Sequence, residues 1–286
     1  SIAQRVNANP QRAIYSSIGG NTPQSLVNEW SEKLAVGEAN MVLLSGVEVI
    51  ASIKAAIKQK TPLDWDEEVE GSLDDLGLGV RGMMDHQAFK HMLMAASCSY
   101  GLCEVARKGS QKKGLQAYTQ GMAELLAPLS DVAAANPYSM YPKSYSAEEI
   151  ATRSEKNAYI AFPYTKAMMA KDRVNQAAAV LLTTVGKARE LGIEESKWVY
   201  LHGYADTAEK GLLQRENLGQ SPALTAAYQQ ALKQANVDSS DIEFIDIYSC
   251  LPIVVAEAKA ALGLADSDKA MAVSYTHLRA HETRHD

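Results

Sequence analysis

The feature that most constrains the fold of this chain is a tight glycine turn between a strand-like run and an amphipathic helix. Residues 13–18 are rich in β-branched and aromatic side chains, as short strands are. The turn 19–22 precedes a helix that has Pro23 in its first turn, where a missing N–H costs nothing, and Gly37 as its stop. The apolar run 41–44 predicts a second, buried strand. Together these elements predict a parallel βαβ unit, and therefore an α/β fold.

The turn 19–22 is also the first candidate for a binding site. In a βαβ unit the turn between strand and helix lies at the carboxyl edge of the sheet, where ligands of such sheets bind. Asn21 or Thr22 is expected to cap the helix, and the positive end of the helix favours anions. We therefore name four substrate-binding candidates, which are Gly19, Gly20, Asn21 and Thr22.

Two segments of this region resemble a known family. Gly-Gly-Asn-Thr-Pro-Gln at 19–24 and Met-Val-Leu-Leu-Ser-Gly-Val-Glu at 41–48 are similar to the nucleophile loop and the following strand of the thiolase superfamily. The similarity is greatest to the divergent thiolase-like branch usually labelled acetyl-CoA acetyltransferase, which is related to the sterol-carrier-protein-type thiolases. Thiolases carry a cysteine in this turn that takes the acyl group from acyl-CoA. Gly19 or Gly20 stands at that position here, so the family nucleophile is absent.

The resemblance covers residues 1–272 and implies the architecture of the chain. It predicts an α/β fold, a thiolase-like layered αβαβα sandwich that is truncated at both ends. The implied domains are a partial N-terminal thiolase half, a mostly helical loop domain, the return of the N-terminal half and the truncated start of the C-terminal half. Their boundaries are 1–60, 61–150, 151–210 and 211–272.

A second turn of the same kind follows a strand near the end of the chain. Residues 242–248 alternate as a strand does, and a helix is predicted over 252–262 with Gly263 as its stop. Thiolases place at this turn an Asn or His that polarises the thioester oxygen. The resemblance therefore implies three catalytic candidates, which are Tyr248, Ser249 and Cys250.

The three candidates differ in the role that they can take. Tyr248 replaces the polarising residue, and its hydroxyl could still donate a hydrogen bond. Cys250 is either the thiol that one variant of the family motif carries or a small buried residue. We expect Gly19, Gly20 and Asn21 to form an anion-accepting turn that faces Tyr248 and Ser249.

Charge and hydropathy exclude several classes of function. The chain carries 28 basic and 34 acidic residues, a formal net charge of −6, which argues against nucleic-acid binding as the main activity. No apolar run approaches the roughly 20 residues that span a bilayer. Three cysteines fit a reducing, cytoplasmic compartment better than a disulfide framework.

No metal site is predicted. His86 and His91 are five residues apart and would point to different faces of a helix. Cys98 and Cys103 share that spacing and have no second pair. Seven of the twelve residues 64–75 are acidic, but they lack the spacing and the glycine of a calcium loop, so we interpret them as a solvated surface insertion.

Local patterns predict the remaining helices and strands. Ser146 and Glu149 have the spacing of a capping box, which starts a short helix. The other local predictions are helices over 47–58, over 80–135 with a break near 108–110, and from Ser221, and a strand over 197–204. By its own pattern the segment 174–191 is one helix, but the family resemblance implies a strand over 177–184 and a short helix after Gly186.

The last fourteen residues, 273–286, match no pattern in the preceding chain. They resemble one reading frame of the transposon-end and adapter DNA of sequencing libraries, and we leave this artefactual tail out of the functional reasoning. The alternative is a polar C-terminal tail. Three of the six histidines lie there, so a metal site built on them would be spurious. We therefore expect a fragment whose natural sequence continues beyond Ala272.

The sequence leaves three functions open, and with them the question of whether the chain is an enzyme. The first is a thiolase-like acyl-CoA acyltransferase of lipid metabolism that acts on or binds CoA thioesters. The second is a non-catalytic thiolase-fold subunit that binds CoA, acyl-CoA or a lipid, and the third is a hydrolase or decarboxylase of CoA esters. The resemblance implies a CoA thioester as substrate or ligand, no covalently bound cofactor, a homodimer or homotetramer, and a partner subunit.

Overall fold

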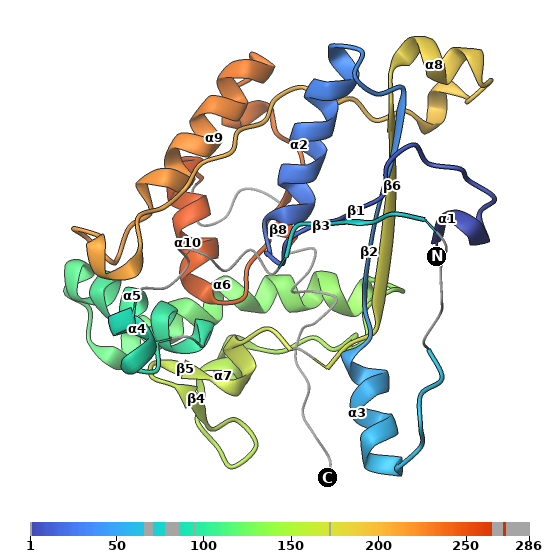
Figure 1. The fold of residues 1–286 in the computed structure, drawn as a ribbon. Helices are drawn as coiled ribbons and strands as arrows, with labels where there is room; N and C mark the ends of the chain where they lie inside the picture. Colours follow the sequence, from blue (N-terminus) through green and yellow to red (C-terminus); the bar gives the residue numbers. More distant parts are fainter. Residues whose placement is uncertain are drawn as a thin grey trace. The chain divides into compact units, whose positions relative to one another are not determined.

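The computed structural model describes residues 2–65, 71–77, 86–93, 95–171, 173–264 and 271–272 (Figure 1). The chain divides into two compact units, and each is described here by itself. The first unit comprises Ser1–Arg81 and Asn175–Gly192, and the second comprises Gly82–Val174 and Ile193–Asp286. The tail 273–286 lies outside the described residues.

The first unit is built on a long antiparallel ribbon. Strand β2 (Met41–Glu48) pairs along its whole length with β6 (Gln176–Thr183), from the pair Met41 and Thr183 to the pair Glu48 and Gln176. Helix α2 (Thr22–Ala35) lies against both strands (Figure 1). The predicted strand at 177–184 is therefore confirmed, although the isolated segment has the pattern of a helix.

The strands on either side of α2 do not form the predicted parallel βαβ unit. Strand β1 (Ile14–Tyr15) pairs in parallel with β3 (Asp74–Asp75), and an ion pair of 2.7 Å between Arg12 and Asp74 lies beside that pairing. β2 belongs to a different two-stranded sheet and its partner is antiparallel. β2 pairs with β6 and not with β1 because β6 offers eight uncharged residues, whereas β1 has only two.

Three helices complete the first unit. Helix α3 (Ile50–Gln59) starts later than the predicted 47–58, because β2 continues to Glu48. Asn175 ties α3 to the start of β6, since it accepts from the Ser52 amide at 3.1 Å and donates to the Ser52 hydroxyl at 2.8 Å. The other two helices are α1 (Ile2–Arg5) and α8 (Val185–Glu190).

The second unit has a helical core. Its main helices are α5 (Ala96–Gln111), α6 (Leu115–Ala135), α9 (Pro222–Ala235) and α10 (Pro252–Ala261), and a short α4 (His86–Lys90) precedes them. Helix α6 contributes to two apolar clusters, one through Met122 and the other through Leu129, and the second cluster also joins α9 and α10. The helical prediction for 80–135 is confirmed for the described residues. Its break lies at 112–114 and not at 108–110, because the left-handed residue is Lys112.

A short helix and a hairpin pack on this core. The predicted capping box is confirmed, because the Ser146 hydroxyl accepts from the Glu149 amide and the Glu149 carboxylate accepts from the Ser146 amide at the start of α7 (Ala147–Ala151). The hairpin consists of β4 (Tyr159–Ala161) and β5 (Tyr164–Thr165), followed by the 3-10 turn η1 (Lys166–Met168). Asn157 joins the two parts by donating to three carbonyl oxygens around α7.

The strand predicted at 197–204 is wrong. After the 3-10 turn η2 (Glu195–Lys197) this segment has no regular structure. It packs on α9 so closely that a Cβ on Gly203 would lie 2.1 Å from the Ala231 carbonyl oxygen. The Tyr204 amide donates to the Gln234 side chain at 3.0 Å, so this backbone donor goes to a helix and not to a neighbouring strand.

The end of the chain follows the prediction more closely. Ser221 caps α9 by accepting from the Leu224 amide, and the 3-10 turns η3 (Leu212–Gln214) and η4 (Ser239–Asp241) lie on either side of that helix in sequence. The strand expected over 242–248 is limited to β7 (Ile245–Asp246), which pairs in parallel with β8 (Met271–Ala272). Helix α10 ends before Gly263, which has φ +65.

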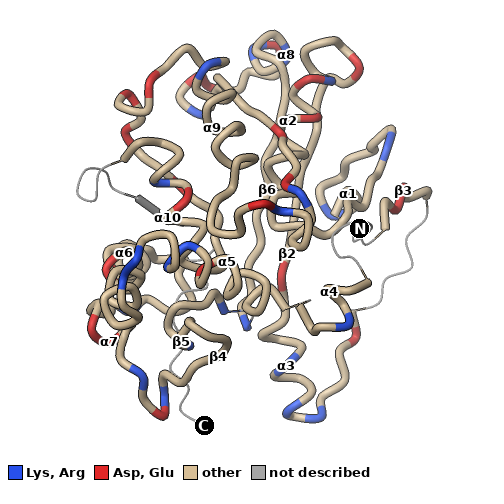
Figure 2. The backbone as a smooth tube through the Cα atoms, turned by 90° about the vertical axis from the view of Figure 1, so that its left-hand side faces the viewer, with Lys and Arg blue, Asp and Glu red and all other residues tan. Residues whose placement is uncertain are grey.

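In the described part of the chain no helix has both the length and the apolar character that crossing a bilayer requires. Lys and Arg positions and Asp and Glu positions are both scattered along the described chain (Figure 2). This mixture agrees with the absence of a long basic cluster in the sequence.

We expect Gly101→Ala to destabilise the protein, whereas Gly109→Ala in the same helix should not. A Cβ on Gly101 would lie 2.7 Å from the backbone carbonyl oxygen of Phe162, but a Cβ on Gly109 meets nothing within 4 Å. Overpacking costs about 1–3 kcal/mol, and Gly→Ala at an open helical site gains about 0.5–1 kcal/mol. Urea unfolding followed by circular dichroism measures both free energies. Equal unfolding midpoints for the two variants would contradict the packing of α5 on the hairpin.

Candidate functional site

The first candidate turn, 19–22, leads directly into α2. The Thr22 amide donates to the Gly19 carbonyl oxygen at 3.1 Å, which closes the turn before α2. Asn21 occupies the N-cap position, but its side chain accepts no hydrogen bond from the helix. Its amide nitrogen instead lies 3.5 Å from the Ser25 hydroxyl. The side chain of Asn21 therefore caps no amide of α2, but the Thr22 and Ser25 amides donate to backbone oxygens of the turn and Pro23 has no N–H. That the turn accepts an anion stays a prediction.

The side chain of Thr22 closes the space beside Gly19, which is one of the two positions where the resemblance places the family cysteine. A Cβ built on Gly19 would lie 2.7 Å from the Thr22 hydroxyl oxygen and 3.2 Å from the Asn21 side-chain oxygen. A cysteine at this position would therefore require the Thr22 side chain to rotate. The four residues 19–22 bring together a helix end and a hydroxyl, but no thiol.

The second candidate turn brings Tyr248, Ser249 and Cys250 together. The Tyr248 hydroxyl lies 3.5 Å from the Cys250 sulfur. Ser249 is 3% exposed, and its hydroxyl donates to the Leu251 carbonyl at 2.6 Å and accepts from the Leu251 amide at 3.1 Å. The hydroxyl of Ser249 thus shapes the turn, while the hydroxyl of Tyr248 and the thiol of Cys250 lie nearer the surface.

The two turns belong to different units, since 19–22 lie in the first and 248–250 lie in the second. Each turn has the local geometry described above. That the two turns face each other stays a prediction.

The three cysteines have different environments. Cys103 is 4% exposed, and burial raises the pKa of its thiol although the nearby Arg215 guanidinium opposes that shift. Cys98 and Cys250 are partly exposed, and all three thiols are free. Because the thiolate is the nucleophile, Cys103 is poorly suited to hold an acyl group. Cys250 is the thiol that lies in a candidate turn.

The structure adds one residue that the sequence analysis did not single out. Glu104 of α5 is 1% exposed and accepts hydrogen bonds from the hydroxyls of Tyr118 at 2.5 Å and Tyr164 at 2.8 Å. Burial raises the pKa of its carboxyl, while both hydrogen bonds and the positive Arg107 oppose that shift. The sequence did contain a signal for this residue, because Glu104 is a single acid within the apolar stretch Leu102-Cys103 and Val105-Ala106. Such an acid is expected to be buried, and a buried charge needs hydrogen-bond partners.

In the described residues no three His, Cys, Asp or Glu side chains are placed to hold an ion. That the protein has no metal site stays a prediction. His86 is the first residue of α4, and His91 directly follows the helix. The acidic stretch 64–75 falls partly outside the described residues, and its last two members form β3.

We expect iodoacetamide to alkylate Cys98 and Cys250 faster than Cys103 in the folded protein. A raised pKa leaves less thiolate at any given pH, so the Cys103 rate should be the lowest of the three between about pH 7 and 9. Peptide mass spectrometry of timed samples measures each rate. The control is the protein in urea, where the three rates should converge. A folded-state rate at Cys103 equal to that at Cys98 would contradict the burial described above.

Comparison with solved structures identifies the fold. A monomeric SCP2-thiolase like protein type 1 from Mycobacterium smegmatis matches 96% of this chain with a TM-score of 0.81 and 36% sequence identity. An aldolase complex named Ltp2-ChsH2(DUF35) matches 86% of the chain with a TM-score of 0.57 and 14% identity. Human mitochondrial 3-ketoacyl-CoA thiolase in complex with CoA matches 92% with a TM-score of 0.51 and 14% identity.

The chain spans about half of the length of the Mycobacterium smegmatis protein, 54%, and 57% and 65% of the other two chains. No protein-family model matches the sequence. No curated protein matches it either. The predicted α/β, thiolase-like fold is confirmed, since the structural neighbours are SCP2-thiolase-like proteins and thiolases.

Proposed function

We propose that this protein is a thiolase-like acyltransferase of lipid metabolism, similar to acetyl-CoA acetyltransferases, that takes a CoA thioester as substrate. The observation that carries the proposal is the 36% identity over 96% of the chain to an SCP2-thiolase like protein. The human thiolase that shares the fold is described in complex with CoA, which supports the ligand class. Fold alone does not fix chemistry, so the proposal also depends on the two turns.

In the proposed site the turn 19–22 receives the negative charge of the substrate. The Thr22 and Ser25 amides donate to backbone oxygens of the turn and Pro23 has no N–H, so the Gln24 amide and the positive end of the helix dipole remain for an anion. Such donors stabilise either a phosphate of CoA or the oxyanion that forms when a thioester is attacked. Tyr248 is proposed to donate a hydrogen bond to the thioester oxygen, in place of the Asn or His of the family.

Cys250 is the proposed acyl acceptor. Its thiol loses a proton, and its sulfur attacks the carbonyl carbon of the thioester. The bond from that carbon to the sulfur of CoA then breaks, and the departing CoA thiolate takes up the proton. The nearby Tyr248 hydroxyl, 3.5 Å from the sulfur, supports this assignment because it can hydrogen-bond to the thiolate.

A second candidate function is a non-catalytic subunit that binds CoA, acyl-CoA or a lipid. The specific observation in its favour is the turn 19–22, which has no thiol and whose side-chain space at Gly19 is occupied by Thr22. The aldolase complex that shares the fold carries two components in its name, which supports a partner subunit. The neighbour from Mycobacterium smegmatis is described as monomeric, so a homodimer or homotetramer is the less supported part of the proposal.

We propose a cytoplasmic location and no covalently bound cofactor. The three free cysteines support a reducing compartment.

Incubation of the whole chain with radiolabelled acetyl-CoA tests the proposal. We expect saturable binding by equilibrium dialysis, and a protein adduct that survives denaturation and is released by hydroxylamine. Cys250→Ala should abolish the adduct and retain binding, because the turn 19–22 is unchanged. Cys98→Ala is the matched control, since it removes a partly exposed thiol outside the candidate turns.

Each outcome decides between the candidates. Binding with an adduct at Cys250 supports the acyltransferase. Binding without an adduct supports the non-catalytic subunit. No binding at acetyl-CoA concentrations up to about 1 mM, the upper end of ordinary substrate affinities, contradicts both.

A further inference from the structure

The second unit contains a pocket that is lined by residues between 143 and 167 and by neither candidate turn. Its volume is about 380 Å³, and its walls come from the segment before α7, from α7, from the loop after it and from the start of η1. Small-molecule sites have volumes of about 300–1,000 Å³, so this pocket can hold more than a single small ion. Three lysines from three different segments line it, which are Lys143, Lys156 and Lys166.

These three lysines lack an ion-pair partner in the described part of the chain. None of them forms an ion pair there, whereas Lys33 and Lys187 each pair with a nearby glutamate. The ammonium nitrogen of Lys143 lies over the ring of Tyr145, 4.3 Å from its centroid. Positive charges around one pocket repel one another, and an anion that binds among them offsets that repulsion.

Lys156 and Lys166 are held in place by the residues that follow them. The side-chain oxygen of Asn157 accepts from the Ala167 amide at 2.8 Å. The side-chain nitrogen of Asn157 donates to three carbonyl oxygens around α7, at distances between 2.9 and 3.2 Å. The Asn157 side chain therefore fixes both lysine-bearing segments on α7.

The segment that carries Lys143 is fixed on α6. The Tyr145 amide donates to the Ser130 hydroxyl at 2.9 Å, and the Ser144 hydroxyl donates to the Asp131 carboxylate. Both partners belong to α6. A pocket whose walls are fixed before binding loses less conformational entropy when a ligand enters it.

Glutamates and hydroxyl groups also line the pocket. Glu149 is engaged in the capping box of α7, which leaves Glu148 as the second acid. Three lysines and two glutamates give the lining a formal charge of +1, in a chain whose net charge is −6. The Ser146 and Ser154 hydroxyls each accept from a backbone amide at 3.1 Å, so in the described residues the hydrogen of each hydroxyl remains for another acceptor. The pocket thus offers ammonium and hydroxyl donors to an anion.

The pocket shares an apolar cluster with the second candidate turn. Tyr145 belongs to that cluster, and both Ala167 and Cys250 pack against it. Ala167 lines the pocket, and the Ala170 amide donates to the Cys250 carbonyl oxygen at 3.1 Å. Three residues of chain therefore connect the pocket wall to a direct contact with the turn.

We infer that this pocket binds the phosphate group of a small molecule. Phosphate oxygens are strong acceptors for ammonium and hydroxyl donors, and lysine serves them as a point charge. The phosphate comes from CoA or from free phosphate. The first source rests on the proposed function, and the second does not.

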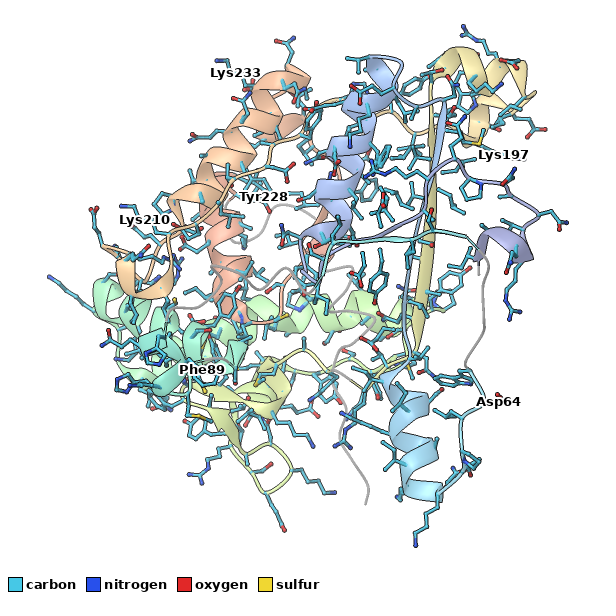
Figure 3. All side chains as sticks on the ribbon, in the orientation of Figure 1. Asp64, Phe89, Lys197, Lys210, Tyr228 and Lys233 are labelled. Carbon is cyan, nitrogen blue, oxygen red and sulfur yellow. The ribbon has the colours of Figure 1, made fainter. Side chains whose placement is uncertain are left out.

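Acetylation of lysines by N-hydroxysuccinimidyl acetate in the full chain tests this inference, with peptide mass spectrometry to measure the rate at each lysine. Saturating adenosine bisphosphate, the nucleotide end of CoA, should slow acetylation of the three pocket lysines about threefold or more, because phosphate holds their ammonium groups. The internal controls are three exposed lysines elsewhere on the chain (Figure 3), which are Lys197, Lys210 and Lys233. Their rates should not change.

Two further arms identify the source of the phosphate. If inorganic phosphate protects the pocket lysines as well as the bisphosphate does, the pocket is a site for free phosphate. If it protects them less, the pocket is a site for the phosphate ester of CoA. Sodium chloride at the same ionic strength should protect no lysine.

Charge variants give a second readout, which is the dissociation constant of the bisphosphate in equilibrium dialysis. Lys156→Gln keeps a long polar side chain but removes one positive charge, and it should weaken binding about three- to tenfold. Glu148→Gln removes a negative charge from the same lining and should strengthen binding about twofold or more. Lys233→Gln is the matched control and should leave the constant unchanged.

The outcomes separate this inference from the proposed function. Protection confined to the pocket lysines, with opposite effects of Lys156→Gln and Glu148→Gln, supports a phosphate site. Equal protection of pocket and control lysines, protection by sodium chloride alone, or no protection overturns it. If acetyl-CoA binds without protecting the pocket lysines, the proposed function stands and the inference falls. If inorganic phosphate protects them in a chain that does not bind acetyl-CoA, the inference stands and the proposed function falls.

Discussion

The packing of the second unit depends on the carboxylate of Glu104, which has almost no access to water. Glu104 would cost several kcal/mol to ionise in an apolar core without partners, so its surroundings must supply donors. Those donors are the hydroxyls of Tyr118 on α6 and Tyr164 on β5, and meeting them fixes how these two elements lie on α5. The candidate turn Tyr248–Cys250 leads directly into α10. That helix is joined to α5 by the ion pair between Arg107 and Glu257.

The sequence predicted the local features of this structure and missed the long-range pairings. The capping box of Ser146 and Glu149, the Ser221 cap and the extent of α10 depend on residues within four positions of one another. The partner of β2 is β6, more than a hundred residues away, and nothing in either strand specifies an antiparallel register. The prediction of a strand at 197–204 was wrong for the same reason. Gly203 packs on helix α9, and the residues next to Gly203 in the sequence do not indicate that contact.

In the candidate site, too, the local features were predictable from the sequence and the packing was not. The turn 19–22, its helix and the turn 248–250 follow from motifs in the sequence. The burial of Ser249 and Cys103, and the role of Glu104, depend on three-dimensional packing that no spacing rule reports. An acid in an apolar helical stretch indicates a buried carboxylate, but the sequence does not show which donors hydrogen-bond to it.

The distribution of thiols and hydroxyls limits the chemistry open to this thiolase fold. The turn that carries the family nucleophile has a threonine hydroxyl beside Gly19, and an unactivated hydroxyl is a far weaker nucleophile than a thiolate. Burial raises the pKa of Cys103, which leaves the partly exposed Cys98 and Cys250 among the three cysteines of the chain. Of these two, Cys250 lies at the start of a helix with a tyrosine hydroxyl beside it. In the proposed function the acyl group is therefore carried on the sulfur of the second turn, because the first turn offers only a hydroxyl.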